Sequence, residues 1–345
     1  MGFTTKHLNE VRKKIAPADE TLSAARSRRK EVLDSVKGYH GRLRDYSSGS
    51  IGHGTANDDT DADCGMVLDR RTYPELGPDG DDVGPEDVLE DVRKTIREAL
   101  KPKYPTLTTR LSKRAIVVKF GEPLGPNDDS PDPSVDLIVA LTRKDAEGLW
   151  IPNRFDKSWD PSHPERHTQL LIDPPEAVRR LRAQTIRLVK AQIRQYNSPG
   201  VCSFNAEALA LECINREISL GLAVTEWFEY ASKELKKADT KDPAGISKPI
   251  KLLLDRDVVV ERLENVAHHM RTAIDHDDDE DAVVEELAIV FWKYVQKPVG
   301  ATSKASFASA LREGNRGFNR AGVFAPTVGA STLKTVSSYG DGKVR

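Results

Sequence analysis

The chain has 345 residues, of which 38% are hydrophobic and 31% are charged, and its formal net charge is −2. This composition is typical of a polar globular protein that can bury a substantial core in two or three lobes. The near balance of charge argues against a strongly basic surface, so we expect no stable nucleic-acid binding. No apolar run approaches the length of a membrane span, and the N-terminus lacks the apolar core of a signal peptide. We therefore expect no membrane association.

The three cysteines, Cys64, Cys202 and Cys213, form neither a CxxC pair nor the framework of a secreted scaffold. A reducing compartment is therefore expected, and we predict a cytoplasmic protein. Cys64 is expected to be a small buried hydrophobic residue on the strand face opposite Asp63.

The first half of the chain alternates predicted helices and strands. Residues 7–44 have the apolar spacing of one or two charged helices, and residues 85–100 form a helix that starts with proline and acids. Apolar runs at 113–120 and 134–141 predict strands separated by a proline-rich loop. This order predicts an α+β fold, with a small mixed sheet and helices on one side.

Helical patterns dominate from Pro174 onward, so we place a lobe boundary near residue 165. The predicted division is a core at 1–165, a helical lobe at 166–313 and a loop-rich tail at 314–345. The acidic run near the end of the helical lobe is interpreted as a solvated loop between helices. The predicted helices of this lobe are 176–196, 204–222, 225–237, 258–274 and 282–296.

A glycine-rich stretch begins at Gly49-Ser50 and continues through Gly54-Thr55. Glycine lets backbone N–H groups approach an anion closely, as a nucleoside triphosphate requires. The stretch lacks the lysine of a Walker A loop and the strand-then-GxGxxG context of a dinucleotide fold. A flexible turn is the alternative interpretation. His53 lies inside this stretch. Contact with the substrate is one interpretation, but a lone loop histidine is more often simply exposed, which is the state we expect.

Three aspartates accompany apolar, strand-like runs. Asp61 and Asp63 lead into Cys64–Leu68, and on a strand their side chains share one face. Asp136 lies inside the predicted strand at 134–141. Aspartate is rare in strands and costly to bury, and bound divalent ions offset that cost. The pattern therefore predicts a two-metal phosphoryl-transfer site, although three solvent-edge aspartates at strand ends are the alternative.

The ordered set of glycine-serine, glycine-threonine, Asp-x-Asp and a later aspartate resembles the DNA-polymerase-β-type nucleotidyltransferase superfamily. Within it, the chain looks most like the bacterial cGAS/DncV-like nucleotidyltransferases (CD-NTases). The resemblance covers about residues 30–240 and continues through four later segments, at 148–154, 159–164, 187–192 and 203–209.

The resemblance implies a polymerase-β-type core joined to a helical lobe like that of the oligoadenylate synthases. It also implies two Mg²⁺ ions, or Mn²⁺ in their place, held by catalytic Asp61, Asp63 and Asp136. Nucleotide phosphates would be bound by the residues that match the family's loop and helix motifs, which are Gly49, Ser50, Gly54, Thr55, Lys190 and Ser203. For Lys190 and Ser203, the alternative interpretation is that both are ordinary helix residues, the lysine solvated.

The implied reaction condenses ribonucleoside triphosphates, such as ATP or GTP, into a cyclic di- or trinucleotide with release of pyrophosphate. The implied setting is bacterial antiphage signalling (CBASS), in which a separate effector protein reads the product. Two alternatives stay open. One is a nucleotidyltransferase with another acceptor, such as a tRNA end, a small molecule or a protein. The other is a catalytically silent nucleotide-binding module.

Overall fold

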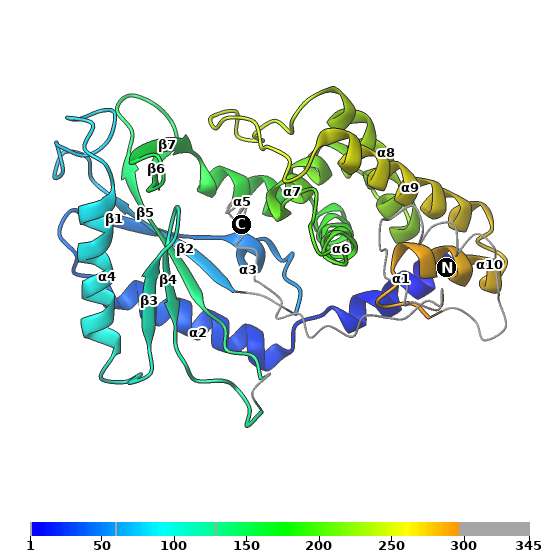
Figure 1. Cartoon of the computed structure of the whole chain (residues 1–345), viewed down its shortest axis with the longest axis horizontal. Helices are drawn as coiled ribbons and strands as arrows, with labels where there is room; N and C mark the ends of the chain where they lie inside the picture. Colours follow the sequence, from blue (N-terminus) through cyan, green and yellow to red (C-terminus); the bar gives the residue numbers. More distant parts are fainter. Residues whose placement is uncertain (1, 59–60, 128–129, 297–345) are drawn as a thin grey trace, which may run out of the picture.

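The structure is a computed structural model that describes residues 2–58, 61–127 and 130–296. The predicted tail at 314–345 lies outside the described residues. Figure 1 shows two lobes side by side, a sheet flanked by helices and a helical lobe. The predicted α+β fold, a small mixed sheet followed by a helical lobe, is confirmed.

The described residues form a seven-stranded sheet with the order β1-β2-β5-β4-β3, and β6 pairs with β5 and with β7. The central strands β2 and β5 are parallel, whereas the other pairs are antiparallel, so the sheet is mixed. The strands are β1 Arg42–Ser48, β2 Ala62–Leu68, β3 Thr108–Leu111, β4 Ile116–Lys119, β5 Val135–Thr142, β6 Leu149–Asn153 and β7 Ser158–Ser162.

Helices cover one face of this sheet and build the second lobe. Helices α2 and α4 pack over the sheet, as both views show. Helices α6 to α10 bury a separate apolar core. The described helices are α1 Phe3–Lys14, α2 Asp19–Ser35, α3 Gly49–His53, α4 Glu86–Leu100, α5 Pro164–Ile172, α6 Glu176–Ile193, α7 Ser203–Cys213, α8 Leu220–Lys237, α9 Arg256–Asp275 and α10 Glu280–Val290.

The two faces of β2 have different surroundings, although every residue of the strand is buried. Cys64 and Met66 pack into the core beneath α2 and α4, which confirms the prediction for Cys64. Val67 belongs instead to a small cluster on the opposite face, with Ile138 of β5. Because side chains alternate along a strand, Asp63 shares the face of Val67. The carboxylate is therefore on the face that α2 and α4 leave open.

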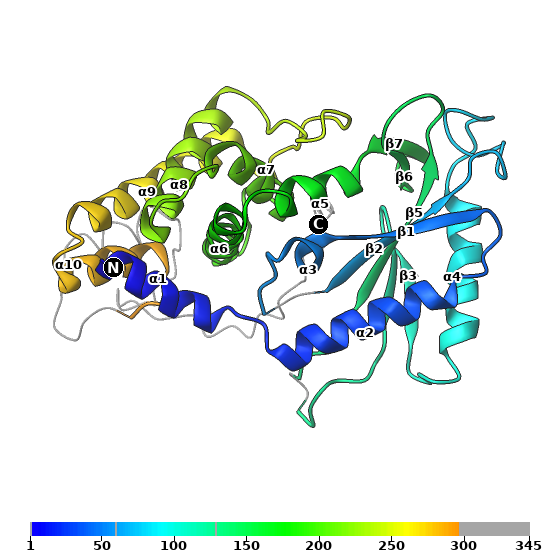
Figure 2. The same cartoon turned by 180° about the vertical axis from the view of Figure 1, so that it is seen from behind.

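The N-terminal segment is shared between the lobes. Leu8 and Val11 of α1 lie in the core of the helical lobe, whereas Ala25 and Val32 of α2 lie in the core under the sheet. A short non-helical segment around Pro17 separates the two helices, because the helical hydrogen bonds stop there. This segment therefore ties the two lobes together (Figure 2).

Three helix predictions were wrong in extent, and one of them is the helix predicted at 282–296, which ends at Val290. The segment 36–44 is not helical: it turns and enters β1, and its Leu43 is 51% exposed. The helix predicted at 204–222 is two helices, since α7 ends at Cys213 and α8 begins at Leu220. Ser219 caps α8 by accepting the backbone N–H of Leu222, which fixes a new helix start there. Among the described residues, no helix is both long and apolar enough to cross a membrane.

Gly65 in β2 gives a test of the packing on the open face. A Cβ added there would lie 2.1 Å from the ring of Tyr46, whereas one added at Gly38 would meet nothing within 4 Å. We expect Gly65→Ala to lower the free energy of unfolding by about 1–3 kcal/mol, because overpacking forces neighbours to shift. Chemical denaturation should show this loss, and the control Gly38→Ala should change little. If both variants unfolded at the same midpoint concentration of denaturant, this packing of Tyr46 against Gly65 would be contradicted.

Candidate active site

The glycine-rich stretch forms a short helix, α3, where a loop was expected. Gly49 opens it with φ +68°, and a Cβ there would lie 1.8 Å from Oδ2 of Asp63. Only glycine combines that backbone conformation with so close an approach. Gly54, at φ +71°, ends the helix, and the N–H of Thr55 donates to the carbonyl of Ser50 at 2.9 Å. The backbone of Gly49 therefore rests directly on the Asp63 carboxylate.

Two of the three predicted metal ligands are brought together by the sheet. Asp63 of β2 and Asp136 of β5 are direct partners in the parallel register. Partners in adjacent strands lie about 4.8 Å apart and project from the same face. Asp63 is 6% exposed, and Asp136 is half-buried. The pairing follows from the two apolar strand patterns, which set both acids at the same level of the sheet.

The third aspartate is held differently. Asp61 precedes β2, and its Oδ1 accepts the backbone N–H of Ser134 at 3.0 Å. Among residues 2–58, 61–127 and 130–296, no group of three or more His, Cys, Asp or Glu is arranged to hold a metal ion. The adjacent Asp63 and Asp136 carboxylates suit a hard divalent cation. Asp63 and Asp136 therefore fit two of the three predicted ligand positions of a metal ion. The ligand role of Asp61 stays a prediction.

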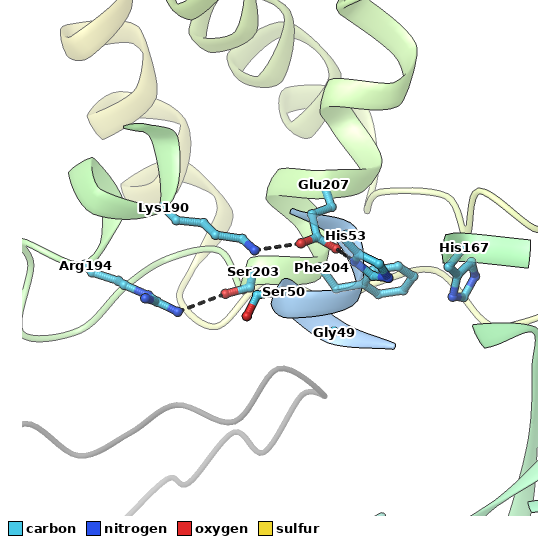
Figure 3. A pocket seen from close by; sticks show the side chains of 9 residues that line it. All are labelled: Gly49, Ser50, His53, His167, Lys190, Arg194, Ser203, Phe204 and Glu207. Atoms are coloured by element: carbon cyan, nitrogen blue, oxygen red, sulfur yellow. Dashed lines mark hydrogen bonds and ion pairs between the residues drawn. The ribbon is translucent and has the colours of Figure 1, made fainter. Parts of the chain in front are cut away.

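A pocket lies between the lobes beside α3 (Figure 3). It brings together Gly49 and Ser50 from the first lobe and Lys190 and Ser203 from the second, four residues predicted to bind nucleotide. The full lining is Gly49, Ser50, His53, His167, Lys190, Arg194, Ser203, Phe204 and Glu207. Small hydroxyl residues, the start of a short helix and cationic side chains together favour the binding of an oligophosphate.

Lys190 is buried, at 3% exposure, so the interpretation of a solvated lysine is wrong. Its Nζ donates to Glu207 Oε1 at 2.6 Å and to Thr55 Oγ1 at 3.0 Å. The Thr55 hydroxyl donates to the same Oε1 at 2.6 Å. Thr55 does not line the pocket, and its hydroxyl joins the first lobe to Lys190 and Glu207 of the second.

His53 is buried as well, and the expectation that it would be exposed was wrong. Its Nδ1 lies 2.9 Å from Glu207 Oε2 and its Nε2 lies 3.0 Å from Thr168 Oγ1. Burial alone would raise the pKa of Glu207, but the charges of Lys190 and His53 outweigh burial and hold this pKa well below its usual range. Glu207 is therefore a buried anion whose two oxygens contact Lys190, Thr55 and His53.

Sequence reasoning missed four pocket residues, of which only Glu207 and Phe204 lie in a segment that carries the family resemblance, 203–209. Glu207 is the acid of the Ser-Phe-x-x-Glu segment, and it follows Ser203 by four positions, so both lie on one face of α7. Arg194 follows Lys190 by the same spacing at the end of α6. Its Nη2 lies 3.5 Å from the Ser203 hydroxyl. His167 and Phe204 complete the lining, with ring centroids 4.8 Å apart.

No known sequence family matches the chain, and no curated protein matches it significantly by sequence. Solved structures of bacterial nucleotidyltransferases do match it. CdnC from E. coli MS115-1, solved in complex with HORMA-deltaN, superposes with a TM-score of 0.63 at 15% identity, over 86% of this chain and 98% of that one.

Two further structures agree. Vibrio cholerae DncV, a cyclic AMP-GMP synthase solved with a linear intermediate, gives a TM-score of 0.60 at 13% identity, over 86% of this chain and 97% of that one. The Bradyrhizobium diazoefficiens CD-NTase CdnG, solved with GTP, gives 0.61 at 15% identity, over 83% and 94%. The chain therefore has the CD-NTase fold, as its sequence resemblance implied.

Replacing Glu207 tests the network. Glu207→Gln would leave buried Lys190 without its countercharge, and we expect about 3–5 kcal/mol less stability at pH 7. Because the folded pKa of Glu207 lies below the unfolded value near 4.5, its contribution is complete above that pH and declines as the pH falls further. The difference from the wild type should therefore shrink below about pH 4.5.

Urea denaturation at several pH values measures this difference. Glu217→Gln is the matched control, because Glu217 is an exposed acid of the same lobe. A Glu207→Gln variant as stable as the control at pH 7 would show that the buried ion pair contributes nothing.

Proposed function

We propose that this protein is a nucleotidyltransferase that condenses ribonucleoside triphosphates into a cyclic di- or trinucleotide. The observation that carries the proposal is the Asp63–Asp136 pair on adjacent parallel strands, with Gly49 packed against Asp63 at the edge of the pocket. Paired carboxylates beside a phosphate-binding loop are what in-line transfer to an α-phosphate requires.

Each group has a distinct task in this proposal. Gly49 and Ser50, at the start of α3, would hold the β- and γ-phosphates, and Ser203 and Arg194 would approach them from the helical lobe. Asp136 would position the attacking ribose hydroxyl or accept its proton. Two Mg²⁺ ions, held by Asp61, Asp63 and Asp136, would offset charge on the triphosphate and lower the pKa of that hydroxyl.

Lys190 requires a modified assignment. Its charge already meets Glu207 at 2.6 Å, so its net contribution to phosphate binding is reduced. We infer that Lys190 fixes the position of α3 relative to α7. It would lie near the phosphates as one half of the Lys190–Glu207 ion pair. Two transfers would close a dinucleotide ring, the second intramolecular. The proposal extends to antiphage signalling through a separate effector protein, in line with the family that the sequence resembles.

The test is synthesis from defined substrates. Wild-type protein incubated with Mg²⁺ and the four ribonucleoside triphosphates should yield a cyclic oligonucleotide, identified by mass spectrometry. Asp63→Asn and Asp136→Asn should each lower the yield at least about 100-fold, because losing a metal ligand costs more than losing an outer-shell partner. The control Asp81→Asn changes an exposed surface acid and should retain full activity.

Three other outcomes are informative. Nucleotidyl transfer only after a tRNA, small-molecule or protein acceptor is added would replace the cyclic product but keep the site. Nucleotide binding with no pyrophosphate release under Mg²⁺ or Mn²⁺ would favour a silent binding module. Full activity of both aspartate variants would contradict the site itself.

A further inference from the structure

A second group of cationic side chains lies between α1 and α6, outside the pocket. Arg12 comes from α1, and Arg180 and Arg187 come from α6. Arg187 lies one helical turn before Lys190, yet it does not line the pocket. None of these arginines has a task in the proposed reaction.

The guanidinium groups of Arg12 and Arg187 are both oriented by neutral side chains. Arg12 Nη1 donates to the side-chain oxygen of Asn9 at 2.6 Å, and Arg187 Nε donates to that of Asn57 at 3.3 Å. Asn57 is fixed in turn, because its Nδ2 donates to the carbonyl of Arg187 at 3.1 Å. Amide oxygens hold a guanidinium group in place without neutralising its charge.

Further N–H groups at this site are buried without a partner. In the part of the chain that the structure describes, Arg12 Nε and Arg187 Nη2 are buried and make no hydrogen bond. Unsatisfied donors on charged groups are expensive to bury. In a native fold, two such donors on neighbouring guanidinium groups indicate that an acceptor belongs there.

The electrostatics point the same way. Burial and then the positive charge of Arg12 hold the pKa of Arg187 below its ordinary value. Burial and then the charge of Arg180 do the same for Arg12. Asp58 favours the charged form of Arg187 and offsets part of this repulsion. Among the described residues, these charges are three arginines and one carboxylate, so their sum is positive.

We propose that Arg12 and Arg187, with Arg180 beside them, form a second anion-binding site that takes a phosphate or oligophosphate group. The two parallel N–H groups of a guanidinium group can bond to two oxygens of one phosphate. An anion bound between the arginines would also offset the repulsion between their positive charges. Asn57, which orients Arg187, lies in the sequence between α3 and Asp61.

The experiment is a binding titration with sodium tripolyphosphate, by calorimetry on the full chain in EDTA. It needs no catalytic activity, so its failure is distinct from failure of the proposed function. Arg12→Ala and Arg187→Ala should each weaken binding at least tenfold. Lys13→Ala is the matched control, since it removes an exposed cation from the same helix and should change affinity less than twofold.

Thermal unfolding without ligand separates a binding role from a structural one. If the arginines repel each other, Arg12→Ala should melt at the same temperature as the wild type or higher. Arg12→Lys, which keeps the charge and loses the fork, should recover only part of the affinity. Unchanged tripolyphosphate binding in Arg12→Ala would overturn the inference. So would loss of binding only in Arg194→Ala, because the anion would then occupy the pocket.

A second titration with ATP in EDTA distinguishes the two sources of phosphate. If the site takes the triphosphate of a nucleotide held between the lobes, Arg12→Ala should weaken ATP and tripolyphosphate binding together. If it takes a free oligophosphate, ATP binding should be unchanged while tripolyphosphate binding falls. Both results support the anion site, and they assign its ligand.

Discussion

The arrangement of the two lobes depends on one buried anion, the Glu207 carboxylate. Glu207 accepts the Lys190 ammonium and the Thr55 hydroxyl at 2.6 Å each, and its other oxygen lies 2.9 Å from His53. His53 and Thr55 belong to the sheet lobe, whereas Lys190 and Glu207 belong to the helical lobe. Burying these charges is unfavourable unless all of them meet at once, so the pairing fixes how the lobes close. The pocket exists where that closure brings α3 beside α6 and α7 (Figure 3).

The sheet supplies the second constraint. Alternation along β2 sends Cys64 and Met66 beneath the covering helices and leaves Asp63 on the other face. The parallel register with β5 then sets Asp136 beside it. Gly49 allows α3 to approach this pair more closely than any side chain would permit. Strand alternation, strand register and a glycine thus position Asp63, Asp136 and the start of α3, and the helical lobe contributes Lys190, Arg194 and Ser203 to the pocket.

The sequence predicted the parts with local signals. Apolar runs located β2 and β5, and the proline-led pattern located α4, because burial on both faces or on one stripe leaves a clear periodicity. Strands β1, β3, β6 and β7 were missed. β1 is dominated by charged and hydroxyl residues, and the other three strands have only four or five residues each. The burial of His53 and the role of Glu207 have no local signal, because both depend on a contact between residues 154 positions apart. The convergence of Ser50 with Ser203 was inferred only through the family resemblance.

The central claim is that the paired carboxylates bind the metal ions of nucleotidyl transfer. The most direct measurement is a crystal structure with Mn²⁺ and a non-hydrolysable nucleoside triphosphate, in which anomalous scattering locates the ions. We expect manganese bound by Asp63 and Asp136, with Asp61 turned from Ser134 towards it and phosphates at Ser50. Nucleotide bound in the pocket with no manganese on these carboxylates would contradict it.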